Sequence, residues 1–313
     1  MKKNNDFSYG GQAVMEGVMI RGRTGVAIAV RRPDGSIATF CRPLAGLYKG
    51  RLRRLPFVRG VIVLIESLIL GTDALMQSAQ MVTETENEKI TPAMLWSSIA
   101  LGVGLAVGLF FILPLLIIRL FDQLIASSFL SNLLEGIIRI IFFIIYLLLI
   151  GRLKDIREIF AYHGAEHMAV NGYEAGQPLD VKHLRNYSTA HTRCGTSFLL
   201  TVLILSIFIF ALIGRPDIWI SILSRVLFIP VIAAVSYEFI KFETGFGRNK
   251  LIHWILLPGL WLQSLTTRQP SDSQLEVAIA AMKKALETDG VPQTGAAVTA
   301  PQEDSIQSAD TVH

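Results

Sequence analysis

Four apolar segments of membrane-spanning length limit what this chain can fold into more than any other feature of its sequence. They cover residues 93–118, 133–150, 198–213 and 218–240. A helix needs about 20 predominantly apolar residues to cross a bilayer, because no water is present there to satisfy backbone polar groups. The sequence therefore predicts a mainly α-helical, polytopic membrane protein with about four transmembrane helices.

Two further apolar stretches do not meet this requirement. Residues 57–82 are interrupted by Glu66, and residues 251–265 are only 15 residues long and contain Pro258-Gly259. We expect the first stretch to lie along the membrane interface or dip into it. We expect the second to be a re-entrant or interfacial helix rather than a fifth crossing.

Basic residues set the expected orientation of the spans. Residues 1–60 contain twelve Lys and Arg and residues 151–196 contain six, whereas only Arg119 and Arg215 follow the first and third spans. Because Lys and Arg are enriched in cytoplasmic loops, both termini and the 151–196 segment are expected to face the cytoplasm. The chain is thus predicted to be a multi-pass protein of the cell membrane.

The expected partners follow from the same features. The basic cluster in residues 49–59 precedes apolar sequence, so we expect it to contact anionic lipid of the bilayer. No nucleic-acid partner is predicted, since the membrane accounts for the basic charge. Gly104 and Gly108 of the first span have the G-x-x-x-G spacing that suits close helix packing, and they could join two copies of the chain.

Residues 1–56 are predicted to form a small, basic, β-rich cytoplasmic unit. The β-prone runs 26–30 and 37–40 flank Pro33-Asp34-Gly35, a sequence typical of a turn, so they should pair as a hairpin. A structural cap is the simplest role for this unit. The alternative is that Glu16, which lies among glycines, belongs to a functional site.

The chain beyond residue 56 divides by composition. The segment near the C-terminus has an apolar stripe typical of an amphipathic helix, and Ser273-x-x-Glu276 would be its capping box. We expect an interfacial helix and linker at 57–90, a transmembrane domain at 91–268 that includes the cytoplasmic segment 151–196, the amphipathic helix at 269–288 and a disordered tail at 289–313.

A histidine-rich segment follows the second span. His163, Glu166 and His167 form an H-x-x-E-H sequence on a predicted helix over 152–170. Residues three and four apart share one helix face, so both imidazoles can bind one metal ion, typically zinc, while Glu166 serves as the catalytic base. A straight continuation of the span would carry the histidines about 20 Å away from it, and a bend would return them to the membrane surface.

Three residues compete for a third metal-ligand position. His191 and Cys194 form an H-x-x-C pair just before the third span, and Glu238 lies at the cytoplasmic end of the fourth. A catalytic zinc site needs three protein ligands and a water molecule, so any one of these residues would complete it. His183, in a polar loop, is expected to be a surface residue.

Several motifs occur together in this chain. They are G-G-Q-A-V-M-E-G at 10–17, Y-H-G-A-E-H at 162–167, H-T-R-C-G-T at 191–196 and P-G-L-W-L-Q at 258–263. Over residues 8–287 this combination resembles the YqhQ family of bacterial multi-pass membrane proteins, which carry a domain of unknown function. The resemblance implies a plasma-membrane location and a family described as predicted metal-dependent enzymes, with no established reaction.

Three hypotheses of function follow. The first is a metal-dependent, zinc-type hydrolase whose site lies at the cytoplasmic membrane face. The second is a non-enzymatic membrane scaffold or assembly factor with a structural metal site. The third is a transporter that uses Arg225 and Glu238 as intramembrane charges, although Arg225 could simply pair with a carboxylate, as Glu135 and Arg139 could with each other.

Overall fold

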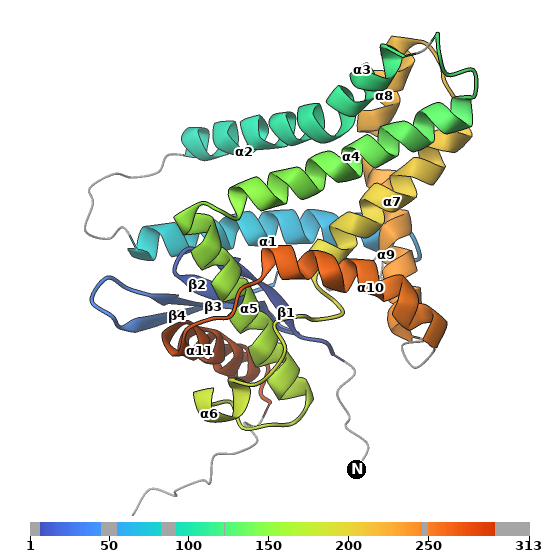
Figure 1. Cartoon of the computed structure of the whole chain (residues 1–313). Helices are drawn as coiled ribbons and strands as arrows, with labels where there is room; N and C mark the ends of the chain where they lie inside the picture. Colours follow the sequence, from blue (N-terminus) through green and yellow to red (C-terminus); the bar gives the residue numbers. More distant parts are fainter. Residues whose placement is uncertain (1–6, 45–54, 83–91, 122, 246–249, 292–313) are drawn as a thin grey trace, which may run out of the picture.

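Long helices and a small sheet occupy neighbouring regions of the protein (Figure 1). The structure, a computed structural model, describes residues 7–44, 55–82, 92–121, 123–245 and 250–291. The apolar segments form helices, and the N-terminal residues form the sheet. The prediction of a mainly α-helical protein with a small N-terminal β-rich unit is confirmed.

The N-terminal unit is a four-stranded antiparallel sheet with the order β1-β2-β3-β4. The predicted hairpin is present: Arg31 pairs with Ile37 across a turn in which Gly35 has a φ of +84°, a conformation that favours glycine. Asp34 accepts a hydrogen bond from the backbone N–H of Ser36 (2.9 Å), which closes the turn. The strands are β1 (Gly10–Val14), β2 (Gly17–Arg21), β3 (Gly25–Arg31) and β4 (Ile37–Pro43).

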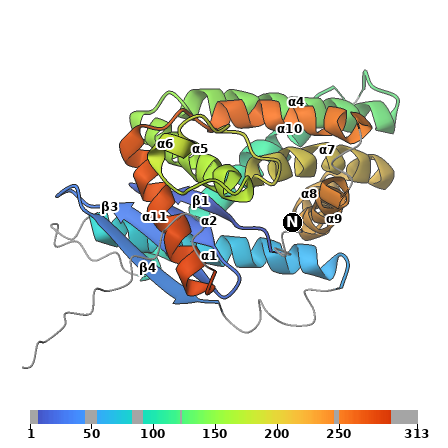
Figure 2. The same ribbon diagram turned by 90° about the horizontal axis from the view of Figure 1, so that it is seen from below.

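Helices cover both faces of this sheet. Val18 packs on the side of α5 (Lys154–Glu174) and α11 (Asp272–Thr288). Met19, the next residue of β2, packs on the side of α1 (Val58–Val82), because successive side chains of a strand point to opposite faces. Figures 1 and 2 show α11 lying across the strands and α1 on the other side. A sheet buried on both faces explains the continuous apolar runs in β2 and β3.

Three helices of the described chain are long and apolar enough to cross a membrane. A fourth crossing results if α8 (Ile218–Leu227) and α9 (Ile229–Gly245), which are bent by 46°, form one broken span. This agrees with the prediction of about four spans. The three long helices are α2 (Pro92–Val107) continued by the π-helix Gly108–Ile112 and α3 (Leu113–Arg119), then α4 (Ser128–Ile150) and α7 (Gly195–Ile213).

The two shorter apolar stretches are also helical. They form α1 and α10 (Lys250–Thr266), and neither is among the helices that meet the length and composition of a span within the described residues. Their location at the membrane interface stays a prediction, as does the cytoplasmic side of both termini.

The first span is irregular where a proline interrupts it. Pro114 has no N–H to donate to the carbonyl four residues earlier, that of Phe110. The side chain of Arg139, on α4, donates its Nε–H to that carbonyl at 2.8 Å. The π-helix Gly108–Ile112 contains this carbonyl. A side chain of the neighbouring helix α4 thus supplies a donor where the proline removes one.

Three charged side chains are buried among the spanning helices. Arg139 and Arg225 donate to the two carboxylate oxygens of Glu135 at 2.6 and 2.7 Å, and none of the three side chains is more than 3% exposed. The Phe210 ring lies 5.3 Å from the Arg139 guanidinium and 4.3 Å from that of Arg225. The predicted Glu135–Arg139 pair is therefore present, and Arg225 joins it.

The predicted cap of the C-terminal helix is displaced by two residues. Ser271, not Ser273, accepts a hydrogen bond from the backbone of Gln274, and the Gln274 side chain accepts one from the Ser271 N–H. Glu276 instead pairs with Arg31 of β3 at 2.9 Å. Both candidate serines precede an acidic or amide residue at capping spacing, and the tertiary pairing with Arg31 takes Glu276 away from the cap.

The first residues of the predicted disordered tail, 289–291, are described, and Asp289 makes several contacts. Asp289 accepts hydrogen bonds from the Tyr9 hydroxyl (2.9 Å), from the backbone N–H of Arg23 (2.6 Å) and from the Thr24 hydroxyl (2.6 Å). These bonds attach the end of α11 to the turn between β2 and β3. The rest of the predicted tail, from residue 292, lies outside the described residues.

Two predicted contact surfaces have different outcomes. Most of the basic cluster, residues 49–54, and the linker at 83–90 lie outside the described residues, while Arg59 is described and pairs with Glu238. At Gly104 and Gly108, apart from their own helix, no described atom lies within 4 Å of an added Cβ. That face is open among the described residues of one chain, and its use between two copies stays a prediction.

Replacing Glu135 should destabilise the membrane domain. In Glu135→Gln two buried guanidinium groups lose their counter-charge, which typically costs about 3–5 kcal/mol. Thermal unfolding in detergent, with size-exclusion chromatography, measures the loss. Leu148→Ala, an exposed site on the same helix, is the control. Equal stability of the two variants would contradict the role of the ion pairs.

Asp289→Ala should destabilise the protein in a pH-dependent way. Burial alone would raise the pKa of Asp289, but the hydrogen bonds from Thr24, Arg23 and Tyr9 outweigh it and lower the pKa. A depressed folded-state pKa stabilises the fold above the unfolded value of about 3.9, and this contribution is lost as the pH falls through the folded-state pKa.

We expect the loss in Asp289→Ala to be about 2 kcal/mol at pH 7 and to shrink below about pH 4. Thermal unfolding across this pH range measures it. Glu287→Ala removes a nearby exposed carboxylate that pairs with Lys284 at 3.1 Å and should change stability little. A pH-independent difference for Asp289→Ala would refute the electrostatic origin.

Candidate metal centre

The helix that carries the histidines does not continue the second span. α4 ends at Ile150, and Leu153 is extended (φ −68°, ψ 137°) before α5 begins at Lys154. The chain bends there, and α5 runs along the sheet (Figure 1). The straight continuation is therefore wrong and the helix bends; the return of the histidines to the membrane surface stays a prediction.

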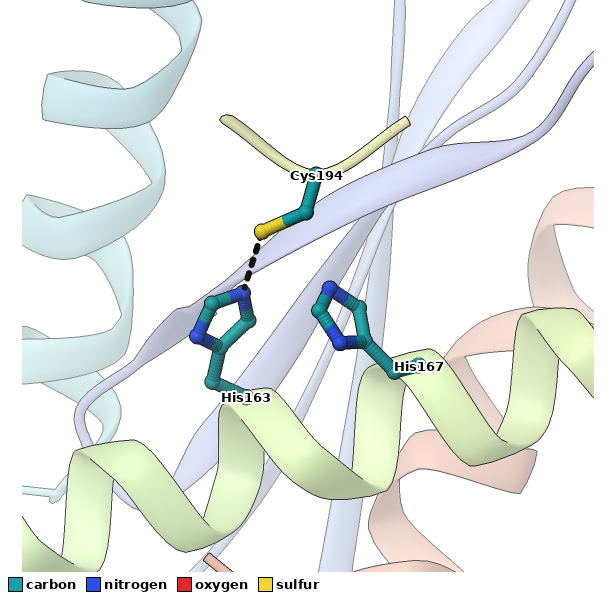
Figure 3. A group of neighbouring side chains, drawn as sticks. All are labelled: His163, His167 and Cys194. Atoms are coloured by element: carbon teal, nitrogen blue, oxygen red, sulfur yellow. Dashed lines mark hydrogen bonds between the residues drawn. The ribbon is translucent and has the colours of Figure 1, made fainter. Parts of the chain in front are cut away.

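His163, His167 and Cys194 form a group that could hold a metal ion. One ligand atom from each lies within 4.8 Å of the others, and the Cys194 sulfur is 3.3 Å from His163 Nε2. Figure 3 shows the two imidazoles rising from successive turns of α5 toward the cysteine. The i, i+4 spacing sets the two rings side by side, with their centroids 4.4 Å apart.

Backbone carbonyls orient both imidazoles. His163 Nδ1 lies 2.9 Å from the carbonyl oxygen of Thr266, and His167 Nδ1 lies 2.6 Å from that of Thr189. A carbonyl oxygen only accepts hydrogen bonds, so each Nδ1 carries a proton, and in the neutral imidazole the lone pair is then on Nε2. This is the arrangement of metal-binding histidines, in which the second nitrogen is held by an acceptor.

Cys194 enters the group from the start of the third span. It is the N-cap of α7, and its sulfur accepts a hydrogen bond from the Thr196 N–H at 3.3 Å. Cysteine binds metal through its sulfur as the thiolate. The side chain is buried, at 6% exposure, so the sulfur faces the histidines and not solvent.

Glu166 lies beside this group without belonging to it. It is 4% exposed, and its Oε2 is 3.5 Å from His167 Nε2. Burial raises the pKa of the Glu166 carboxyl, while nearby His163 and His191 and a hydrogen bond with the Gly11 backbone act in the opposite direction. A buried carboxylate next to the ligand atoms is placed to accept a proton there.

The N-terminal sheet therefore touches the site. Gly11 belongs to β1, and Glu16, in the turn that follows β1, accepts a hydrogen bond from the hydroxyl of Tyr162 at 3.1 Å. Glu16 has a φ of +48°, which is uncommon for a residue with a side chain. The hairpin that carries the glycine-rich motif thus contacts the helix of the H-x-x-E-H sequence.

His191 lies next to the group but makes other contacts. Its Nδ1 accepts from the Arg193 N–H at 3.3 Å, and its Nε2 is 3.5 Å from a carboxylate oxygen of Glu174. Burial alone would raise the pKa of Glu174, but the His191 hydrogen bond and the charge of Arg193 lower it. The His191 ring is 5.8 Å from that of His167, so it borders the centre and faces Glu174.

The other candidate residues lie apart from the group. Glu238 accepts hydrogen bonds from the Arg59 Nε (2.6 Å) and from the Phe57 N–H (3.0 Å). Its carboxylate is therefore bonded at the start of α1 and not to the histidine group. His183 is exposed and contacts Asp180 at 2.7 Å, as expected for a surface residue. Of the three competitors for the third ligand, the structure brings Cys194 within reach of both histidines.

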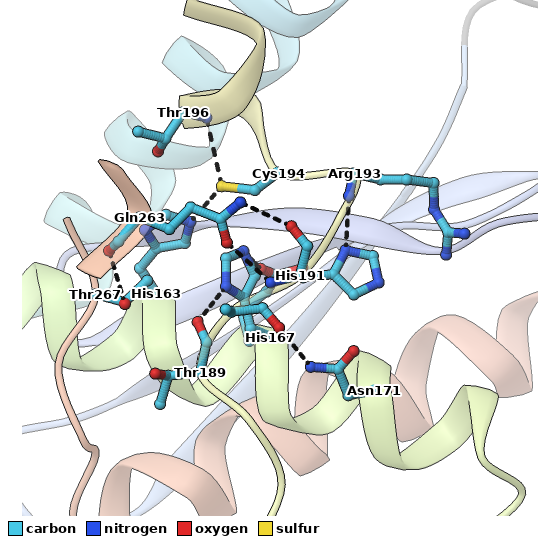
Figure 4. A network of polar contacts seen from close by, with 12 residues as sticks. His163, His167, Asn171, Thr189, His191, Arg193, Cys194, Thr196, Gln263 and Thr267 are labelled. Carbon is cyan, nitrogen blue, oxygen red and sulfur yellow. Dashed lines mark hydrogen bonds and ion pairs between the residues drawn. The ribbon is translucent and has the colours of Figure 1, made fainter. Parts of the chain in front are cut away.

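Sequence reasoning missed the polar residues that hold the site together. Gln263 bonds to the backbone of His191, and Asn171 donates to the carbonyls of Ser188 and Ala190, on either side of the Thr189 that orients His167 (Figure 4). A glutamine within an otherwise apolar segment is a usable signal for such a residue. The backbone carbonyls that orient the histidines cannot be predicted from the sequence, because every residue has one.

The chain is similar to proteins without an assigned reaction. A family model described as "Protein of unknown function (DUF1385)" matches residues 55–288, which include all three members of the metal group. The protein named "Uncharacterized protein YqhQ" from Bacillus subtilis (strain 168) is 31% identical over 300 residues, which cover 91% of this chain and 94% of that protein. No solved structure matches the chain.

The metal group makes a direct prediction of metal content. Purified wild-type protein supplied with zinc should hold about one ion per chain, and the double variant His163→Ala, His167→Ala should hold almost none. His183→Ala, which removes a histidine outside the group, is the matched control and should bind as wild type does. Elemental analysis after removal of loosely bound metal gives the answer, and equal content in all three proteins would remove the site.

Proposed function

This chain belongs to the DUF1385 family, and we propose that it is a metal-dependent hydrolase of the membrane that uses His163, His167 and Cys194 as zinc ligands. The observation that carries the proposal is the meeting of three ligand atoms within 4.8 Å beside the buried Glu166. The resemblance to the YqhQ family predicted this membership, which the comparisons confirm at the level of the family.

The donor set supports zinc in a catalytic site. Two imidazoles and one thiolate are common zinc ligands, and three protein ligands leave a fourth position for water or substrate, whereas a structural site is closed by four. Bound there, zinc would act as a Lewis acid and make a water molecule more acidic. The chain's own residues hold that geometry: carbonyls keep each Nδ1 protonated, and each Nε2 is available.

Glu166 is the proposed general base. Its carboxylate is buried next to His167 Nε2, and a hydrogen bond with the Gly11 backbone orients it. In hydrolysis it would accept a proton from the attacking water and pass it to the leaving group, the role of the carboxylate in H-x-x-E-H enzymes. His191 is proposed to border the site without binding the metal, since its Nε2 faces Glu174 at 3.5 Å.

The location of the site supports a substrate that reaches the membrane boundary. Cys194 immediately precedes the spanning helix α7, and Thr266, which orients His163, ends the apolar helix α10. The basic residues of 1–60 and 151–196 favour the cytoplasmic side. We therefore place the reaction at the cytoplasmic face of the cell membrane.

The alternatives have less support. A scaffold with a structural metal site would be expected to close the site with a fourth ligand, and the group has three members within the described residues. The transport hypothesis depended on Arg225 and Glu238, and each takes part in an ion pair, with Glu135 and Arg59 respectively.

Glu166→Gln separates catalysis from scaffolding. This variant should bind metal as wild type does but lose roughly 100-fold or more of its hydrolytic rate, because the amide cannot accept the proton. Membranes from a strain that lacks the gene are incubated with the purified, zinc-loaded proteins, and released lipid and peptide fragments are measured by mass spectrometry.

Asp155→Asn, an exposed carboxylate on the same helix, is the matched control and should release the same fragments as wild type. The mutant strain complemented with each variant gives the second readout. A Glu166→Gln protein that binds zinc and fully restores growth would argue for the scaffold hypothesis instead.

A further inference from the structure

Gln263 is the most completely bonded polar side chain near the metal group. It belongs to α10 and is 0% exposed. Its Oε1 accepts from the His191 N–H at 2.8 Å, and its Nε2 donates to the His191 carbonyl at 2.8 Å and to the Ser197 hydroxyl at 2.7 Å. Both hydrogens of the amide are used, so the orientation of the side chain is fixed. The amide bonds both the N–H and the carbonyl of the same residue, His191.

The residue that Gln263 bonds leads directly to the cysteine. The Cys194 N–H donates to the His191 carbonyl at 3.3 Å, which closes a turn of four residues, and Cys194 then caps α7. The carbonyl that Gln263 holds is therefore the same one that fixes the start of this turn. A shift at His191 would move the Cys194 sulfur away from His163 Nε2, which is 3.3 Å away.

The same helix also orients the first histidine. The Thr266 carbonyl accepts from His163 Nδ1, and Thr266 follows Gln263 by three residues, so the two lie on neighbouring positions of one helix face. One rigid element thus contacts the main chain before Cys194 and the imidazole of His163. The distance between these two ligands depends on how α10 is seated.

We infer that Gln263 is a positioning residue of the metal centre. Its two hydrogen bonds to the His191 backbone fix that residue against α10 and thereby set the position of the Cys194 thiolate. The inference concerns metal geometry alone, so it holds whether or not the centre catalyses hydrolysis. It also gives α10 a role that its apolar sequence does not show: it aligns a candidate ligand in the middle of α5, His163, with one at the start of α7, Cys194.

Cobalt(II) is the probe that tests this. It occupies zinc sites, and a cobalt–thiolate bond gives a near-ultraviolet charge-transfer band that reports the Cys194 bond specifically. Wild type and four variants are loaded with cobalt, the band is recorded, and affinity is measured by competition with a chelator. The variants are Gln263→Ala, Gln263→Glu, Ser264→Ala and Ser197→Ala.

The expected pattern is specific to the His191 contact. Gln263→Ala should lose 10–100-fold in affinity, the usual effect of removing an outer partner of a metal site, with a weaker or shifted thiolate band. Gln263→Glu keeps the acceptor for the His191 N–H but loses both donors, so it should fall between Gln263→Ala and wild type. If Gln263→Ala fails to fold, the cobalt affinity and thiolate band of Gln263→Glu test the inference in its place.

Two controls separate positioning from packing. Ser264 is the exposed neighbour of Gln263, and its hydroxyl bonds to the carbonyl of Trp261 in its own helix, so Ser264→Ala should behave as wild type. Ser197→Ala removes one bond of Gln263 but leaves the grip on His191, and it should keep the band and most of the affinity.

The inference is overturned if Gln263→Ala and Gln263→Glu bind cobalt with the affinity and band of Ser264→Ala. It is also overturned if Ser197→Ala is impaired as strongly as Gln263→Ala, because general packing would then explain both. Absence of cobalt binding by wild type would remove the metal group and this inference together. Cobalt binding without hydrolysis by wild type would remove only the proposed reaction.

Discussion

Every polar group that this chain takes out of water needs a partner inside the protein, and the arrangement of the helices follows from the pairings. In the spanning region Glu135 neutralises one of two buried guanidinium groups, and Arg139 also satisfies a carbonyl that Pro114 leaves without its usual donor. Lone charges and open carbonyls are costly in an apolar medium. These pairings therefore join α4, α8 and the irregular first span.

The same constraint builds the metal group. His163 and His167 are in part removed from solvent, and each gives its Nδ1 proton to a carbonyl from a different segment, the end of α10 and the loop before α7. The bonds that satisfy the histidines also leave both Nε2 atoms facing Cys194. The carbonyl acceptors that make burial of the two imidazoles tolerable are therefore also the ones that orient these candidate ligands.

Ion pairs between distant segments connect the sheet with α1, and α1 with α9. Arg21 of β2 pairs with Glu66 of α1 at 3.0 Å, and Arg59 of α1 pairs with Glu238 of α9. Glu66 thus interrupts an apolar stretch because the sheet packs there. Glu238 was a plausible metal ligand from its position in the sequence, but in the structure it pairs with Arg59 of α1. The hairpin of β1 and β2 in turn reaches Glu166 through Gly11, so the N-terminal unit is part of the site's wall.

The sequence by itself determined what depends on neighbours a few residues apart. Hydropathy over 20 residues predicted the spans, the Asp34-Gly35 turn predicted the hairpin, and helical spacing predicted that His163 and His167 share a face. Only the tertiary structure decided that Cys194, and not His191 or Glu238, lies within reach of both histidines, that α5 bends away from α4, and that Gln263 and two carbonyls hold these residues in place. The physical reason is that these contacts join segments up to about a hundred residues apart, and such contacts depend on which surfaces pack together. Every residue has the same backbone carbonyl, so no pattern of side chains predicts which carbonyls bond to the two histidines.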